Sequence, residues 1–302
     1  MASQAQQQSL PIVAYLSASR ALPPALLNGL TESGYAIGRN VRIERRTTED
    51  ARQLPALVAD LVRLQPSVIS AQASAVALAL KAATSTIPIV FGIGDDPVRL
   101  GLVASLNRPG GNLTGATNLN VELEGKRLAM MHAIVPAGET IAALVDANNP
   151  AADRQLANIQ NAADSLGRKI RILKAANERD IDNAFKTIAQ EKLGSLFVAA
   201  DAYFGARSSQ FVTLAAYNAV PVFYSRREFA EAGGLVSYGT DNDASFRQQG
   251  IYIGRILNGE RPADLPVVQA TKFELVINLK TAKSLGVTFP IDILALADTV
   301  IE

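Results

Sequence analysis

The sequence predicts an α/β protein of two doubly wound, parallel-sheet lobes joined by a hinge of three crossovers. Short β-rich apolar runs alternate with helical segments along most of the 302 residues, and the alternation forms two successive βαβαβ patterns. The segment Gly233–Gly286 then adds a strand, a helix, a crossing segment, a second strand and a helix. A protein with one sheet, formed by strands and helices in simple succession, would not need this additional segment. A chain that builds two α/β units and goes back to them is typical of a two-lobed clamp.

The first unit is predicted from alternating and helical spacing. Val41–Arg46 alternates apolar and polar residues, as a strand with one covered face does. Ser74 stands where a helix N-cap is expected. The predicted strands are Ile12–Leu16, Val41–Arg46, Ser67–Ala71, Ile87–Ile93 and Leu113–Asn118. The predicted helices are Ala21–Gly34, a stripe of Leu54, Leu57, Val58, Leu61 and Val62, Ser74–Thr84 and Val98–Leu106.

The second unit repeats this order without detectable sequence identity to the first. The predicted strands are Ile141–Asp146, Lys169–Ala175, Ser195–Ala200, Val220–Ser225 and Leu235–Tyr238. The predicted helices are Val121–Val135, stripes at Leu156, Ile159, Ala163 and Leu166 and at Ile181, Phe185 and Ile188, and Ser208–Ala219.

The return segment predicts how the two units are connected. Asp241 or Asn242 caps a helix that ends at Gly259. A strand at Phe273–Ile277, a helix Leu279–Leu285 capped by Asn278 and a last amphipathic helix Ile291–Ile301 follow. Crossovers are expected near Asn118, Tyr238–Asp241 and Gln269–Lys272. They divide the chain into lobe 1 (1–118 with 242–271) and lobe 2 (119–241 with 272–302), which close by hinge bending.

Composition excludes several classes of function. The 29 basic and 28 acidic residues give a net charge of +1, so no general attraction to nucleic acid is expected. Without cysteine there are no disulfides, thiolate metal sites or cysteine nucleophiles. The single histidine, His132, argues against a catalytic triad or histidine metal site. No GxGxxG follows the first strand, and no GxxxxGK[ST], HExxH or GxSxG occurs. We therefore expect no cofactor and no metal.

The beginning of the chain bears on its location. The polar segment MASQAQQQSL lacks the basic and apolar regions of a signal peptide. It also resembles the start of a mature secreted protein, which leads to the hypothesis that a signal has been removed. No run approaches the roughly 20 apolar residues that span a bilayer.

Open parallel sheets bind ligands beyond the carboxyl ends of their strands, and the residues there suit a small zwitterionic or amphipathic molecule. Hydroxyls and helix N-terminal amides suit a carboxylate, four aspartates including Asp146 suit an ammonium, and tyrosines suit a flat apolar group. The candidate ligand-binding residues are Ser17, Ser19, Gln72, Ala73, Ser74, Gly94, Asp95, Asn118, Asn148, Asp201, Tyr203, Tyr224, Tyr238 and Asp241.

Several of these residues also have a purely structural interpretation. Ser74 and Asp241 suit helix N-caps, and Asp95-Asp96-Pro97 is ordinary turn chemistry. The tyrosines could place their rings in the core, and His132 fits a partly buried helix position.

Four segments resemble the solute-binding proteins of ABC importers, in the group similar to tryptophan- and tyrosine-binding proteins. They are Asp95–Val98 with Gly101–Val103, Asn107–Asn118, Leu235–Asp241 and, most specifically, Gly254–Gly286. The likeness covers essentially all of the chain after Ser9. It implies a type I periplasmic-binding-protein fold, a small-molecule solute, an ABC permease as membrane partner, and a location in the periplasm or anchored outside the cytoplasmic membrane. It also implies a monomer, by analogy. Matching positions carry solute binding to Ser17, Gln72, Ser74, Asp95, Asn148, Asp201, Tyr224 and Asp241.

The leading hypothesis is a non-enzymatic protein that captures an aromatic amino acid or a related aromatic acid. Because Trp is absent, Tyr and Phe would contact the aromatic ring. The alternative is an α/β enzyme with a cleft carboxylate of raised pKa, such as Asp201 or Asp95. A third hypothesis is a sensor module, which would need a signalling partner.

Overall fold

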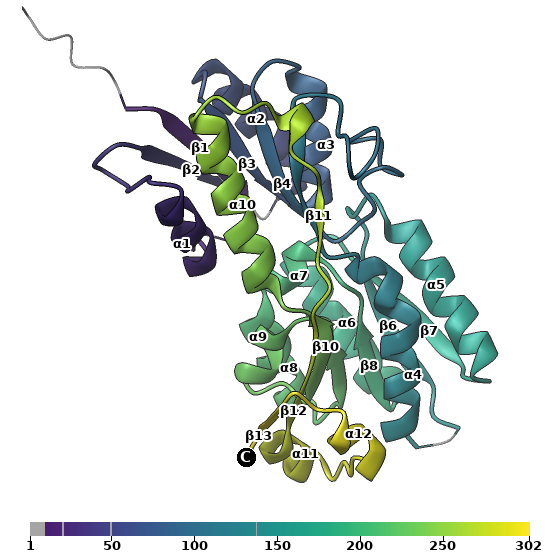
Figure 1. Ribbon diagram of the computed structural model, residues 1–302. Helices are drawn as coiled ribbons and strands as arrows, with labels where there is room; N and C mark the ends of the chain where they lie inside the picture. The colour runs from purple at the N-terminus through teal and green to yellow at the C-terminus, as the bar shows by residue number, and fades with distance from the viewer. Residues whose placement is uncertain (1–9, 20, 49, 137) are drawn as a thin grey trace, which may run out of the picture.

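The computed structural model describes residues 10–19, 21–48, 50–136 and 138–302, and it contains two sheets, each covered by helices on both faces (Figure 1). The predicted polar leader, residues 1–9, lies outside the described residues. The α/β class with two parallel-dominated sheets is confirmed. None of the described helices combines the length and apolar character needed to cross a membrane.

The first sheet is entirely parallel and has the order β11-β5-β4-β3-β1-β2. Its strands are β1 (Ile12–Ser17), β2 (Arg42–Thr47), β3 (Val68–Gln72), β4 (Ile89–Ile93), β5 (Leu113–Thr117) and β11 (Val268–Gln269). Helices α2 (Leu54–Arg63) and α3 (Ser74–Ala83) pack on one face. Helices α1 (Pro24–Glu32) and α10 (Asn242–Leu257) pack on the other.

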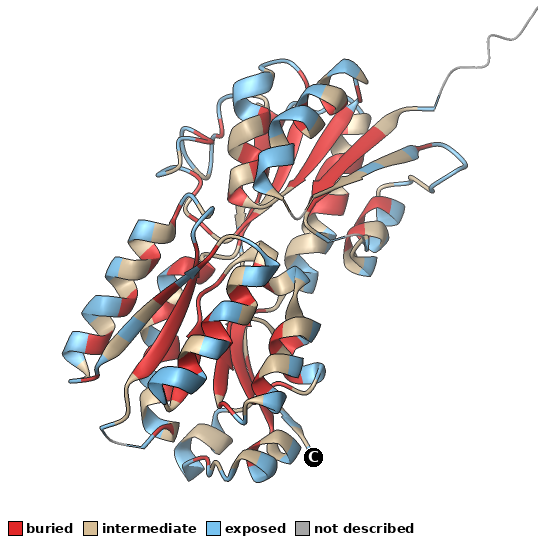
Figure 2. Ribbon diagram, turned by 180° about the vertical axis from the view of Figure 1, so that it is seen from behind, coloured by how far each residue is buried: buried red, intermediate tan, exposed pale blue. Residues whose placement is uncertain are grey.

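The second sheet has the order β13-β12-β10-β9-β8-β6-β7 and is parallel except between β10 and β12. Its strands are β6 (Ile141–Asp146), β7 (Ile170–Ala175), β8 (Ser195–Val198), β9 (Val222–Tyr224), β10 (Val236–Thr240), β12 (Phe273–Asn278) and β13 (Thr299–Ile301). One face packs against α4 (Glu124–Ile134), α5 (Ala152–Ser165) and α11 (Leu279–Leu285). The other packs against α6 (Glu178–Glu191), α7 (Ala202–Ala206), α8 (Ser208–Tyr217) and α9 (Arg227–Glu231). The central strands of each sheet are buried between the helices that cover its two faces (Figure 2).

Close approach of two helices fixes the return segment to the first sheet. A Cβ at Gly29 of α1 would lie 2.0 Å from the Arg247 carbonyl oxygen, and one at Gly250 of α10 would lie 2.1 Å from the Leu26 carbonyl oxygen. Any side chain here would force the backbones apart, so these glycines allow α1 and α10 to touch. This contact joins residues that are more than two hundred positions apart in the sequence.

The chain passes between the two sheets three times. It leaves the first sheet after β5, returns from β10 into α10, and leaves again between β11 and β12. At the first passage the 3-10 helix η2 (Asn120–Leu123) precedes α4. At the second and third, the backbone N–H of Asp241 donates to the Lys272 carbonyl at 3.1 Å, which ties these two connections together.

Two predicted helices are wrong. Residues Val98–Leu106 form turns, because Gly101 adopts a positive φ of 68° and interrupts the helical path. The segment Ile291–Ile301 splits into the short helix α12 (Ile291–Ala295) and strand β13. Asp298, between α12 and β13, attaches the chain to β12. Its N–H donates to the Leu275 carbonyl at 2.9 Å, and its Oδ2 accepts from the Leu275 N–H at 2.8 Å. Pairing with β12 therefore overrides helical spacing.

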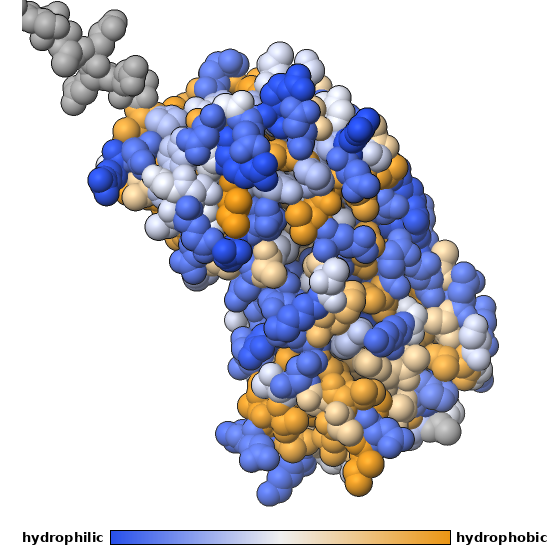
Figure 3. All heavy atoms as spheres, viewed as in Figure 1, coloured by the Kyte–Doolittle hydropathy of each residue, from blue (hydrophilic) through white to orange (hydrophobic). Residues whose placement is uncertain are grey.

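The end of the second sheet farthest from the first carries exposed apolar side chains, visible near α11 and α12 in Figure 3. Ile291 is 81% exposed and Leu296 is 62% exposed. Both residues belong to the segment that divides into α12 and β13, and their side chains point to solvent rather than to a core.

Candidate ligand-binding site

A cavity of about 620 Å³ lies between the two sheets, at the carboxyl ends of their strands. The first sheet contributes the residues after β1, β2, β3 and β4, and the second contributes the residues after β6, β8 and β9. Asn118, Asn120 and Asn242, at two of the passages between the sheets, also line it. The position agrees with the general rule for open parallel sheets.

All but three of the candidate residues from the sequence line this cavity. Those that do are Ser17, Ser19, Gln72, Ala73, Ser74, Gly94, Asp95, Asn118, Asn148, Asp201 and Tyr203, and Asp146 lines it as well. Their part in ligand binding stays a prediction.

Tyr224 and Tyr238 lie outside the cavity lining. Tyr224 is fully buried and its ring stacks on Phe229 at 4.4 Å. Burial raises the pKa of its phenol. Tyr238 is 6% exposed, and its hydroxyl accepts from Lys126 Nζ at 2.6 Å. Both side chains face helices that cover the sheet, so Tyr203 is the one of the three predicted tyrosines that lines the cavity.

Asp241 also lies outside the lining and acts as a helix cap. Its carboxylate accepts from the Asp243 N–H at 3.0 Å, which makes it the N-cap of α10. It also accepts from Lys272 Nζ at 3.0 Å. Both contacts hold the connections between the sheets, and neither directs the carboxylate at the cavity.

Ser74 is not the predicted N-cap of α3. The N-cap is Ala73, whose φ of 141° is rare for a residue with a side chain. The Ser74 hydroxyl instead donates to Asp95 Oδ2, and the other carboxylate oxygen of Asp95 accepts from Arg154 Nη2 at 2.8 Å. Burial raises the pKa of Asp95, although Ser74 and Arg154 act in the opposite direction. Asp95 thus already has a cationic partner.

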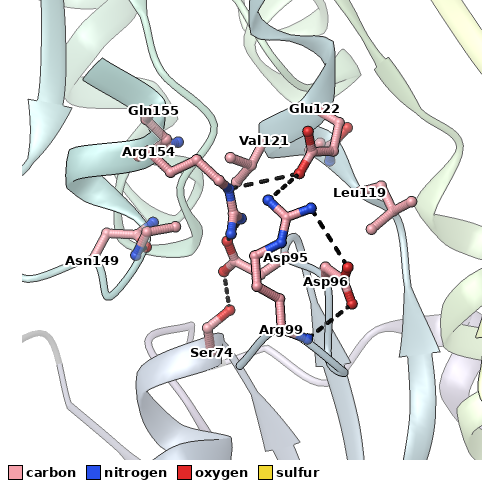
Figure 4. A network of polar contacts seen from close by, with 12 residues as sticks. Ser74, Asp95, Asp96, Arg99, Leu119, Val121, Glu122, Asn149, Arg154 and Gln155 are labelled. Atoms are coloured by element: carbon pink, nitrogen blue, oxygen red, sulfur yellow. Dashed lines mark hydrogen bonds and ion pairs between the residues drawn. The ribbon is translucent and has the colours of Figure 1, made fainter. Parts of the chain in front are cut away.

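Arg154 comes from α5, so its contact with Asp95 joins the two sheets. Its Nε lies 3.6 Å from Glu122 Oε1, and Arg99 lies 3.5 Å from the same oxygen (Figure 4). Arg99 also pairs with Asp96 at 3.7 Å. Figure 4 shows these side chains pointing toward one another from the turn after β4, from η2 and from α5.

Two carboxyl groups of the second sheet lie together at the cavity. Asp146 ends β6 and Asp201 follows the neighbouring strand β8. Asp146 is 5% exposed. Burial, followed by the charge of Asp201, raises the pKa of Asp146 to about 8, and burial also raises the pKa of Asp201. The pair holds a proton at neutral pH.

A pair of amides lies on the side of the first sheet. Gln72 Nε2 donates to Gln249 Oε1 at 2.7 Å and to Ser70 Oγ at 2.9 Å. A Cβ at Gly92 would lie 2.6 Å from both amide groups, so glycine leaves room for the pair. These amides present neutral hydrogen-bonding groups to the cavity.

An apolar wall completes the site. Leu22, Leu54 and Phe246, each half-buried, line the cavity together with Tyr15 and Tyr203. Sequence reasoning missed Leu22, Leu54 and Phe246. Leu54 could have been found from the sequence, because it follows the carboxyl end of β2 and such positions are expected to lie near a ligand.

A buried ion pair stabilises the passage from β5 to α4. Arg127 and Glu124 are both fully buried and lie 2.9 Å apart. Arg127 Nη2 also donates to the Asn120 carbonyl at 2.6 Å, and Glu124 Oε1 accepts from the Ala200 N–H at 3.0 Å. The pair therefore connects the cavity residue Asn120 to the loop that carries Asp201.

Residues 19–301 match the model of a family described as ABC transporter substrate binding protein. A protein of Clostridioides difficile named "Tyrosine-binding protein" is 24% identical over 261 residues, which cover 86% of this chain and 74% of the relative.

Two solved structures are similar over 97% of this chain and 100% of their own. One is a conserved domain protein from Vibrio cholerae, with a TM-score of 0.85 and 29% identity. The other is an ABC domain from Streptococcus pneumoniae in complex with L-Trp, with a TM-score of 0.83 and 26% identity.

Proposed function

We propose that this chain, which belongs to the ABC transporter substrate-binding protein family, captures an aromatic amino acid or a related aromatic acid between its two sheets. The observation that carries the proposal is the cavity of about 620 Å³, which combines hydroxyls, carboxyls and amides with an apolar wall. The names of two relatives, a tyrosine-binding protein and a complex with L-Trp, support the aromatic class.

The cavity offers a place for each part of such a solute. The first turn of α3 directs backbone N–H groups toward the solute carboxylate. The carboxyl pair Asp146 and Asp201 lines the side of the cavity that the second sheet forms, across from α3. Tyr203, Leu22 and Phe246 contact the aromatic ring, a role that the absence of Trp leaves to Tyr, Phe and aliphatic side chains.

Capture proceeds by hinge closure. Lobe 1 comprises residues 1–118 and 242–271, and lobe 2 comprises residues 119–241 and 272–302. The three passages between the sheets bend, while each sheet moves with its helices as a rigid body. The closed protein delivers its solute to an ABC permease, acts as a monomer, and resides in the periplasm or anchored outside the cytoplasmic membrane.

One observation favours an enzyme as a second candidate. A carboxyl group with a pKa of about 8 in a cavity, as at Asp146, is typical of a general acid. We propose that the protein nevertheless performs no turnover, since the whole chain follows a family of binding proteins. Prolonged incubation with the bound solute should return it chemically unchanged.

The first experiment is native mass spectrometry of the purified protein, followed by identification of any released small molecule. One aromatic amino acid or acid per chain would support the proposal. Calorimetry with L-tyrosine, L-tryptophan and their des-amino acids then gives affinities. X-ray scattering tests closure. Failure of every aromatic ligand to bind would reject the proposed solute class.

A further inference from the structure

The carboxyl groups of Asp146 and Asp201 occupy adjacent strand ends. The β6–β8 register pairs Leu144 with Val198, so the chain leaves both strands at the same level. The Ala199 N–H donates to the Leu144 carbonyl at 3.0 Å and continues the pairing beyond the strands. The two side chains therefore reach the cavity side by side.

The hydrogen bonds of the two groups are unequal. Asp201 accepts from the N–H groups of Tyr203 at 2.6 Å and Phe204 at 3.2 Å, and from Asn149 Nδ2 at 2.8 Å. Asp146 accepts from the Asn148 N–H at 2.8 Å. Three donors stabilise Asp201 as the anion, so the proton of the pair resides on Asp146, which contacts Asp201.

No basic side chain in the described part of the chain lies within ion-pair distance of either carboxyl group. The basic groups that surround the cavity have acidic partners of their own: Arg154 pairs with Asp95 at 2.8 Å, Arg207 with Glu178 at 2.8 Å, and Arg226 with Glu228 at 3.9 Å. The other ionisable residues that line the cavity in the described part of the chain are Tyr15, Tyr203 and Asp243. Among the described residues, negative charge on the pair thus has no basic partner, which leaves it open to the ammonium group of a solute.

We propose that the solute presents an ammonium group to this site, and that this group displaces the proton shared by Asp146 and Asp201, so that binding releases a single proton per chain. The inference rests on the proposed function and names the solute class within it. An amino acid supplies the ammonium group. An aromatic acid without an amino group supplies no charge for the pair and leaves the proton in place.

The exchange is balanced. Before binding, Asp146 is a neutral carboxylic acid hydrogen-bonded to the Asp201 carboxylate. After binding, both are carboxylates beside one ammonium, and the proton passes to solvent. The free pair has one pKa of about 8, so affinity for an ammonium ligand rises with pH, by up to about tenfold per pH unit, until the pair is ionised.

Calorimetry at pH 7 in two buffers of different ionisation enthalpy measures the released protons directly. With L-tyrosine or L-tryptophan, close to one proton should be released per molecule bound. The des-amino acids 3-(4-hydroxyphenyl)propionate and 3-indolepropionate should bind at least tenfold more weakly and release none. Amino-acid binding without proton release would overturn the inference while leaving the proposed function intact.

Two variants distinguish a specific effect of the Asp146–Asp201 pair from the general effect of removing a carboxylate. Asp146→Asn keeps the acceptor for the Asn148 N–H but cannot give up the proton, so proton release and the pH dependence of affinity should disappear. Asp153→Asn removes an exposed carboxylate from the nearby helix α5 and should change neither. Equal proton release from Asp146→Asn and the unaltered protein would reject the assignment.

A ligand-free measurement tests the pair independently of solute identity. Carbon-13 NMR of aspartate carboxyls should show one group titrating near pH 8 that is missing from Asp146→Asn. If no carboxyl titrates there, the inference fails. If one does and only aromatic acids without an amino group bind, the inference fails while the proposed function stands. If neither aromatic amino acids nor aromatic acids bind, both fail.

Discussion

Asp95 and Arg154 lie 59 positions apart in the sequence and 2.8 Å apart in space, and their ion pair joins the two sheets across the cavity. Asp95 follows β4 of the first sheet and is 2% exposed, while the Arg154 side chain on α5 is 20% exposed. This pair stabilises the present separation of the sheets. It also gives Asp95 an internal cationic partner, and for this reason we propose the Asp146–Asp201 pair as the partner of a solute ammonium.

Arg154→Ala should open the protein and weaken solute binding. The change removes the contact between the sheets and leaves the buried Asp95 with Ser74 as its remaining partner. We expect a loss of about 1–3 kcal/mol, or roughly 5- to 150-fold in affinity. X-ray scattering should show a larger radius of gyration without solute. Arg171→Ala, which breaks an exposed pair between β7 and Glu191 of α6 without involving the first sheet, is the control. Equal effects of both changes would contradict a role between the sheets.

The unfolding free energy should depend on pH through Asp146. Its pKa is about 8 in the folded protein and near 3.8 unfolded, so the folded state retains a proton that the unfolded state loses. Its contribution is present below pH 3.8 and is lost as pH rises through about 8. As the pH rises from 5 to 8, the unfolding free energy of Asp146→Asn should increase by about 2–4 kcal/mol relative to that of the unaltered protein. Urea denaturation at both pH values checks this, and a constant difference would refute it.

Arg127→Met should destabilise the fold strongly. It leaves the fully buried Glu124 without its cation and the Asn120 carbonyl without its donor. The expected loss in unfolding free energy is about 3–5 kcal/mol. The double variant with Glu124→Gln should recover part of this loss, because no uncompensated charge remains. Urea denaturation of both variants measures the coupling, and strictly additive losses would argue against the ion pair.

Gly250→Ala should separate α1 from α10. The added Cβ would meet the Leu26 carbonyl oxygen at 2.1 Å, a backbone atom that cannot move alone. A loss of about 1–3 kcal/mol is expected. Gly125→Ala is the matched control in α4, where the nearest atom is Ala162 Cβ at 3.7 Å. There, the better helix propensity of Ala should leave stability unchanged or raise it by about 0.5–1 kcal/mol. Thermal unfolding of both variants distinguishes them.

Asp241→Ala should affect folding rather than affinity. The change removes the N-cap of α10 and the contact with Lys272, which should cost about 0.5–2 kcal/mol. Because Asp241 does not line the cavity, the dissociation constant should stay within about twofold. Calorimetry on folded protein checks this, and a tenfold loss of affinity at unchanged stability would restore Asp241 as a ligand-binding residue.

Much of the fold could be predicted from local pattern. The bounds of β6 and α11 agree with the sequence to the residue, and Asn278 caps α11 as expected. These elements depend on the spacing of apolar residues and on caps a few positions away. The prediction failed at β13, because its strand character comes from pairing with β12 rather than from its own spacing.

The candidate site could be predicted in position but not in its internal contacts. Strand ends located Ser74, Asp95 and Asp201 at the cavity. The same rule wrongly predicted Tyr224 at the cavity, because it identifies the end of a strand but not the face of the sheet on which the side chain lies. Ser225, the next residue, lines the cavity instead.

The sequence by itself determined the alternation of strands and helices and the loops that gather at the cavity, because both follow from periodicity and chain order. Only the tertiary structure decided that Arg154 neutralises Asp95 and that Asp146 shares a proton with Asp201. Partners so far apart in the chain have no local signal. Their charge states depend on burial and on neighbouring charges, which exist only once the two sheets have folded and met.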